Sequence, residues 1–260
     1  VRLWDLSTRR LVAKTKLDTL ARAVAFSPDG SLVAVGLGGR LGGREAGPQG
    51  GVRVLRGDTL ALVAELTAGR EWIQDLKFSP DGATLAVGSH DHRLHHFSAP
   101  DSTRRATCSG HNSYVTPLDF TADGQFMQST CGAYELLFWR VADGSQMKSG
   151  ATELRDAEWS TWTCTLGWPV QGIWPAEADG TDVNSVDRSK SRKLLVTADD
   201  FGKVKLFNFP AASSKGFEFA EELGHSSHVT NARWSFNDSH VLTTGGNDRA
   251  VLHWRIRSAK

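Results

Sequence analysis

The sequence predicts an all-β fold assembled from repeated antiparallel sheets, and three observations predict it. A turn phrase recurs along the chain, apolar and polar residues alternate on either side of it, and each repeat closes on a strand that ends in a bulky residue. Alternation with a period of two is typical of half-buried strands and argues against helical repeats of similar length. We therefore expect strands throughout the chain, joined by tight turns.

The recurring phrase reads Ala-Phe-Ser-Pro-Asp-Gly at 25–30 and Lys-Phe-Ser-Pro-Asp-Gly at 77–82, with looser copies that begin at Asp119 and Arg233. Pro presets φ, Asp bonds the nearby backbone and Gly accepts a positive φ, so each copy predicts a turn between two strands. The strands that follow the turn are expected within 31–35, 84–87 and 241–244.

A further strand closes each repeat. Its last bulky residue is Trp4, Leu55, Phe97, Trp139, Phe207 or Trp254, at intervals of 51, 42, 42, 68 and 47 residues. A period of about 40–45 residues with this order of strands and turns is typical of WD-repeat propeller blades. The predicted fold is a WD-repeat β-propeller, an incomplete ring of about five full blades plus part of a sixth.

The spacing also predicts the organisation of the chain. Residues 1–17 are expected to be the tail of a preceding blade, and 18–260 the blades that follow. The two long intervals predict a Gly-rich insertion at 36–51 and a Trp-rich insertion at 152–181. The chain lacks an initiator Met, so we expect a fragment or a processed product.

Composition excludes several classes of protein. Lys plus Arg number 30 and Asp plus Glu 29, a balance that argues against a dedicated nucleic-acid binder. No apolar run approaches the roughly 18 residues that span a bilayer, and the N-terminus lacks the pattern of a signal peptide. Cys108, Cys131 and Cys164 form no C-x-x-C motif, which favours a reduced, intracellular compartment.

WD repeats are known for a buried polar network in which a turn Asp and a strand Ser or Thr hold a His, and which ends on a Trp. The last repeat matches this pattern with His225, Thr244, Asp248 and Trp254, which are expected to be structural because buried polar groups must satisfy one another. Other repeats are degraded copies. Ala133, for example, stands where the third full repeat should carry its turn Asp.

Metal binding and catalysis find little support in the sequence. The histidines of 90–96 resemble a metal cluster, but Asp91 is better explained as a turn residue, and His95 and His96 should point to opposite faces of a sheet. No nucleophile elbow, P-loop or dinucleotide fingerprint occurs in the required context. The sequence predicts no catalytic residues, no cofactor and no metal.

Three stretches carry a family resemblance: 158–184, with Trp159, Trp162, Cys164 and Trp174; 199–207; and 224–231. They resemble the echinoderm microtubule-associated protein-like (EMAP-like) family, in its C-terminal WD-repeat propeller, most closely over about 66–255. The resemblance implies a non-enzymatic, microtubule-associated scaffold in the cytoplasm and cytoskeleton, with the ciliary axoneme as one setting. Its partners would be tubulin or other proteins, not nucleic acid or membrane. The alternative is a generic WD-repeat adaptor without direct tubulin contact.

The same resemblance places the family's microtubule-attachment elements upstream, in a basic coiled-coil region and a hydrophobic motif that these 260 residues lack. Two partner-binding surfaces are nevertheless candidates within the chain. One is a basic turn with Arg188, Lys190, Arg192 and Lys193, which is either a contact for an acidic partner or merely a solvated turn. The other is the Trp-rich segment, which is either a protein-docking surface or an enlarged element that packs between blades. Both interpretations hold if only Trp168 and Trp174 are exposed.

Overall fold

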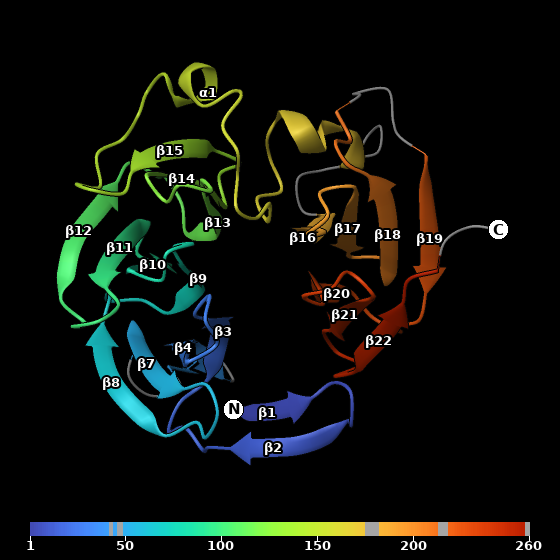
Figure 1. Ribbon diagram of the computed structural model, residues 1–260, viewed down its shortest axis with the longest axis horizontal. Coiled ribbons are helices and arrows are strands. Elements are labelled where there is room, and N and C mark those ends of the chain that lie inside the picture. Colours follow the sequence, from blue (N-terminus) through green and yellow to red (C-terminus); the bar gives the residue numbers. More distant parts are fainter. Residues whose placement is uncertain (42–43, 46–48, 175–181, 213–217, 258–260) are drawn as a thin grey trace. The chain divides into compact units, whose positions relative to one another are not determined.

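The computed structural model describes residues 1–41, 44–45, 49–174, 182–212 and 218–257. The chain divides into two compact units, Val1–Ser160 and Thr161–Lys260. Strands dominate the regular structure of both units, and neighbouring strands within each sheet run antiparallel (Figure 1). The predicted all-β class is confirmed.

The first unit holds most of the sheets. A two-stranded sheet is formed by β1 (Arg2–Asp5) and β2 (Arg10–Lys14). Two four-stranded sheets follow: β3 (Ala21–Phe26), β4 (Leu32–Leu37), β7 (Gly51–Arg56) and β8 (Leu62–Thr67), then β9 (Ile73–Phe78), β10 (Thr84–Ser89), β11 (Arg93–Ser98) and β12 (Arg104–Ser109). A three-stranded sheet contains β13 (Val115–Phe120), β14 (Phe126–Cys131) and β15 (Leu136–Arg140).

The second unit contains one four-stranded and one three-stranded sheet. The first is β16 (Val183–Arg188), β17 (Leu194–Asp199), β18 (Lys203–Asn208) and β19 (Phe219–Leu223). The second is β20 (Val229–Trp234), β21 (His240–Gly245) and β22 (Val251–Arg255). Propeller blades consist of antiparallel strands in chain order, as these sheets do, and the predicted blade architecture is confirmed.

The predicted turns form as their chemistry requires. In the turn between β9 and β10, the carboxylate of Asp81 accepts hydrogen bonds from the Ser79 hydroxyl at 2.5 Å and from the Ala83 N–H at 3.0 Å. Gly82 closes the turn at φ +72°, in the left-handed region that favours glycine. The local sequence is therefore enough to set the register of this hairpin.

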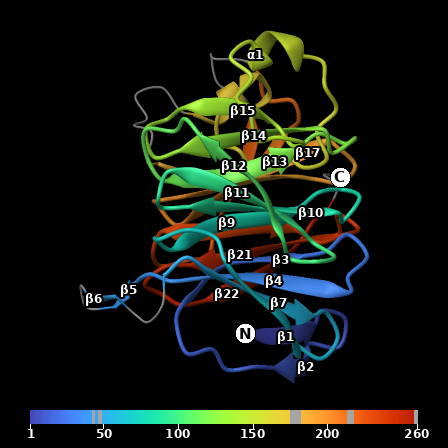
Figure 2. The same ribbon diagram turned by 90° about the vertical axis from the view of Figure 1, so that its left-hand side faces the viewer.

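Neighbouring blades of the first unit pack face to face, as Figure 2 shows from the side. Apolar side chains of β4 and β7 share one buried cluster with those of β9 and β10. Polar groups also join the blades: Lys77 Nζ lies 2.8 Å from a carboxylate oxygen of the fully buried Asp119, and Asp75 accepts the Leu118 N–H at 3.1 Å. Because a buried charge is costly unless it is paired, these contacts fix which strands face each other.

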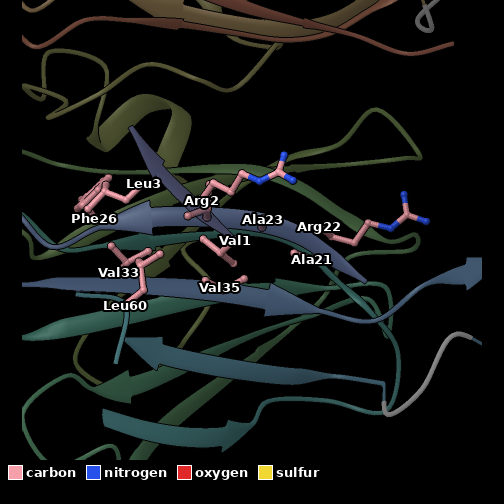
Figure 3. A pocket seen from close by; sticks show the side chains of 11 residues that line it. Val1, Arg2, Leu3, Ala21, Arg22, Ala23, Phe26, Val33, Val35 and Leu60 are labelled. Carbon is pink, nitrogen blue, oxygen red and sulfur yellow. The ribbon is translucent and has the colours of Figure 1, made fainter. Parts of the chain in front are cut away.

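The two-stranded sheet packs on the first four-stranded sheet through apolar side chains of β1 and β4. A hollow lies beside this contact (Figure 3), and the guanidinium groups of Arg2 and Arg22 extend away from it. Its lining includes Val1, Leu3, Ala23, Phe26, Val33 and Leu60. The lining is mainly apolar, and several of its residues also belong to the buried cluster between the two sheets.

The two predicted insertions contain short elements. The hairpin of β5 (Arg40–Leu41) and β6 (Arg44–Glu45) lies in the Gly-rich stretch, and α1 (Gly150–Glu153) and the 3-10 helix η1 (Trp168–Ile173) lie around the Trp-rich stretch. Residues 42–43, 46–48 and 175–181 of these insertions lie outside the described residues. The boundaries of the blades and insertions stay a prediction.

Candidate functional site

The basic turn joins β16 to β17 and presents three cations. Lys190, Arg192 and Lys193 are exposed. Arg188 differs from them, since it is half-buried and its guanidinium lies 5.3 Å from the centre of the Phe209 ring. The four cations that the sequence groups together therefore divide into three that face solvent and one that packs on an aromatic side chain.

A carboxylate from the neighbouring blade holds this turn in shape. Asp238 accepts the backbone N–H groups of Lys190 and Ser191, each at 2.7 Å. Burial tends to raise the pKa of Asp238, but these two hydrogen bonds, together with the Ser191 hydroxyl and the Lys190 charge, outweigh it and lower the pKa below its ordinary value. The backbone between Arg188 and Lys193 is thus fixed by an ionised side chain 47 or 48 residues away.

The Trp-rich segment separates into buried and accessible tryptophans. Trp159 and Trp162 are buried, whereas Trp168 is 63 % exposed at the start of η1. Trp174 is half-buried, and its Nε1 donates a hydrogen bond to the Thr165 carbonyl at 3.0 Å. Trp174 lines a hollow with Leu166, Gly167 and Gln171, and Gly167 directly precedes Trp168 in the chain. An indole with an exposed face beside a hollow is suited to bind an apolar side chain of a partner.

The polar network of the last blade differs from the predicted one in one residue. His225 Nδ1 lies 2.8 Å from the Asp248 carboxylate, while its Nε2 lies 2.8 Å from the hydroxyl of Thr243, not of Thr244. Trp254 Nε1 donates to the same Thr243 hydroxyl at 2.8 Å. The assignment of Thr244 is wrong because successive residues of β21 point to opposite faces, and Thr244 instead bonds the Thr230 hydroxyl.

The third full blade has a related network with a different acid. Ser129 Oγ lies 2.7 Å from His111 Nε2 and 2.8 Å from Trp139 Nε1. Glu135 occupies the place of the missing turn Asp, with its Oε2 3.5 Å from His111 Nδ1. Its carboxylate also accepts the Asn112 N–H at 2.9 Å, and this bond comes first among those that lower the pKa of Glu135 to about 2.

Glu135 was missed in the sequence analysis because the repeats were aligned by residue position, which places Ala133 where the turn Asp is expected. The sequence did contain a signal for this residue: an acidic side chain two positions after Ala133, and a Glu side chain is long enough to reach back over the turn to His111. The same carboxylate accepts a hydrogen bond from Cys131 Sγ at 3.1 Å. His111, Cys131 and Glu135 thus bring three potential metal ligands together, with ligand atoms all within 4.8 Å of one another.

The histidines of 90–96 do not converge in this way. His95 Nε2 lies 3.3 Å from Asp91, whereas Nδ1 of His96 lies 3.2 Å from the Val141 carbonyl. His90 lies between two aromatic rings: it stacks on Tyr114 with centroids 4.4 Å apart and is tilted by 45° to Trp72, with centroids 4.2 Å apart. These contacts assign the three histidines to packing and to separate hydrogen bonds.

Two further observations concern the setting of the chain. Cys108, Cys131 and Cys164 are buried, and no disulfide joins them. Within the described residues, no helix has the length and apolar character needed to cross a bilayer.

Comparison with known proteins identifies the family. Residues 1–256 match the family model described as "Echinoderm microtubule-associated protein second beta-propeller". The chain is 44% identical over 260 residues to echinoderm microtubule-associated protein-like 2 of Rattus norvegicus, covering 98% of this chain and 38% of the relative. It is 42% identical over 260 residues to echinoderm microtubule-associated protein-like 1 of Homo sapiens, covering 98% and 30%. The similarity therefore extends before residue 66, where the resemblance was expected to weaken.

Solved structures agree on the fold alone. A chain of the "Crystal Structure of Mitotic Checkpoint Complex" matches with a TM-score of 0.74 at 18% identity, covering 99% of this chain and 84% of that one. The computationally designed Ika8 protein matches with a TM-score of 0.62 at 16% identity, covering 98% and 77%. With the family model matched over nearly the whole length, the chain belongs to the echinoderm microtubule-associated protein family and corresponds to its second β-propeller.

Proposed function

We propose that this chain is a non-enzymatic scaffold of the cytoskeleton and contacts microtubules through the basic turn. One observation carries the proposal: Lys190, Arg192 and Lys193 are exposed together on a turn whose backbone is held by Asp238. Microtubule surfaces are strongly acidic, so a preformed group of cations would steer and orient the encounter.

Family membership supports the microtubule as the partner. The chain spans about a third of the length of the curated relatives it matches. The basic turn would then add a contact of modest strength, because exposed charge pairs contribute little each and are screened by salt. We expect binding by this chain alone to be weak and to fall with ionic strength.

Co-sedimentation of the 260-residue chain with microtubules tests this proposal. The triple variant Lys190→Glu, Arg192→Glu and Lys193→Glu should pellet less than the parent at low salt. A matched control reverses three exposed cations far along the chain, Arg9, Arg10 and Lys14, and changes the net charge equally. Equal pelleting of the two triple variants would contradict a specific role for the turn. Microtubules without their acidic tails would reveal which part of tubulin is contacted.

A second function is favoured by one observation, the 63 % exposure of Trp168. As an adaptor, the chain would bind a protein through Trp168 and the adjoining hollow, without touching tubulin. Trp168→Ala should then abolish capture of a cytoskeletal partner while leaving microtubule pelleting unchanged. Loss of pelleting in this variant would instead assign Trp168 to the microtubule contact.

A further inference from the structure

Three side chains of one blade meet on the face that carries the loop between β12 and β13. His111 comes from that loop, Cys131 ends β14, and Glu135 lies in the turn before β15. His111 and Cys131 are buried, and the side chain of Glu135 is 27 % exposed. An imidazole, a thiol and a carboxylate are the three donor types that zinc sites use.

The spacing of the donor atoms suits a tetrahedral ion. Oε2 of Glu135 lies 3.1 Å from Cys131 Sγ and 3.5 Å from His111 Nδ1. Zinc–nitrogen and zinc–oxygen bonds of about 2.0–2.2 Å and a zinc–sulfur bond of about 2.3 Å place neighbouring ligands roughly 3.3–3.7 Å apart in a tetrahedron. All three ligand atoms lie within 4.8 Å of one another, so shifts of up to about 1 Å would bring the three groups into a common coordination sphere.

The imidazole is held so that one nitrogen faces the other two donors. Nε2 of His111 lies 2.7 Å from Ser129 Oγ, and that hydroxyl is itself held by Trp139. His111 is only 7 % exposed, so its Nδ1 is buried. Within the described part of the chain, Nδ1 has no hydrogen-bond partner. In a metal-binding histidine, one ring nitrogen is usually fixed by a hydrogen bond while the other binds the metal. Here Nε2 is the fixed nitrogen, and Nδ1 faces the other two ligand atoms.

The last blade provides an internal comparison. There the acid lies closer, with Asp248 2.8 Å from His225 Nδ1, and this pair is satisfied by a direct hydrogen bond. Cys131 lies two residues after Ser129, and the equivalent residue two after Thr243 is Gly245, which has no donor side chain. The cysteine and the longer histidine–carboxylate distance thus occur together in the third full blade.

We propose that His111 Nδ1, Cys131 Sγ and a carboxylate oxygen of Glu135 bind a Zn²⁺ ion, with water as the fourth ligand. On binding, the Cys131 thiol loses its proton to solvent and a zinc–sulfur bond forms, with no change in oxidation state. His111 carries its proton on Nε2 and donates it to Ser129 Oγ, while the Asn112 N–H continues to orient the carboxylate. The ion would tie a loop between strands to the end of β14 and so stabilise this end of the blade.

Metal titration of the full 260-residue chain tests the site. Protein stripped with a chelator should bind one Zn²⁺ per chain, its thermal midpoint should rise on binding, and Co²⁺ should produce a thiolate-to-cobalt charge-transfer absorption. Cys131→Ser should lose that absorption and the thermal shift. Cys108→Ala, which removes a buried thiol elsewhere in the same unit, should keep both.

A conservative variant separates loss of zinc binding from loss of the fold. Glu135→Gln keeps the size of the side chain and an oxygen for the Asn112 N–H, yet weakens the ligand, so zinc affinity should fall at least tenfold with the fold preserved. Two results would overturn the proposal: a parent chain that takes up no stoichiometric zinc, or a Cys131→Ser variant that binds Zn²⁺ and Co²⁺ like the parent. In either case the three residues form only a hydrogen-bonded network.

Discussion

The Asp248 carboxylate lies 2.8 Å from His225 Nδ1, and this contact sets the direction of the hydrogen bonds in the last blade. A carboxylate accepts only, so Nδ1 carries a proton, and in the neutral tautomer of the imidazole Nε2 is an acceptor. The Thr243 hydroxyl therefore donates to Nε2 while it accepts from Trp254 Nε1. One threonine thus satisfies two side chains from different parts of the blade.

Thr243→Val should destabilise the second unit, whereas Thr244→Val should have a small effect. Valine fills the same volume but leaves His225 Nε2 and Trp254 Nε1 without a partner, at a cost of about 1–3 kcal/mol for each buried polar group left unsatisfied. Thr243 is fully buried, while Thr244 bonds an exposed threonine. Denaturant unfolding of both variants measures the difference, and equal midpoints would contradict the assignment of Thr243 to the network.

The pH dependence of stability should include a contribution from His90. Burial between Trp72 and Tyr114 is the largest cause that lowers the pKa of His90, from an ordinary 6.5 to about 4. Below about pH 6.5 His90 is protonated in the unfolded chain, whereas in the folded chain it is protonated only below about pH 4. The free energy of unfolding therefore falls as the pH falls through this interval. The stabilisation is fully present above pH 6.5.

His90→Phe keeps an aromatic ring in the stack and removes the titration. Its unfolding free energy should decline less steeply than that of the parent between pH 6.5 and 4, although burial also lowers the pKa values of His96 and His111, which remain. His92→Asn, at an exposed position, is the control. Parallel curves for the parent and His90→Phe would refute a depressed pKa at His90.

The tryptophans of the Trp-rich segment should differ in their effect on stability. Trp162 is 4 % exposed and packs near Phe209, so Trp162→Ala should cost about 3–5 kcal/mol as a large buried side chain is lost. Trp168→Ala should change stability by no more than about 0.5 kcal/mol, since its ring is largely in solvent. Urea unfolding distinguishes them, and a comparable loss in both would mean that Trp168 is a packing residue.

Local chemistry explains which features could be predicted from the sequence. The Ser-Pro-Asp-Gly turns are encoded in consecutive residues, so turns such as the one at Asp81 and Gly82 could be placed directly. Contacts between blades leave no such signal: Asp238 bonds a turn 47 or 48 residues away, and its role depends on how two sheets pack. Glu135 was missed for a related reason, because a side chain that reaches back over a turn breaks the spacing of the repeat.

Asp238 also allows charge and shape to be separated at the basic turn. Asp238→Asn removes one negative charge beside Lys190 but keeps an oxygen for only one of the two N–H groups, so the local potential becomes more positive while one of the two hydrogen bonds that hold the backbone is lost. If electrostatic steering governs the microtubule contact, this variant should pellet more than the parent at low salt and equally at high salt. Asp156→Asn makes the same charge change at an exposed site in the other unit and should leave pelleting unaltered. Weaker pelleting of Asp238→Asn at low salt would mean that the geometry of the turn matters more than its charge.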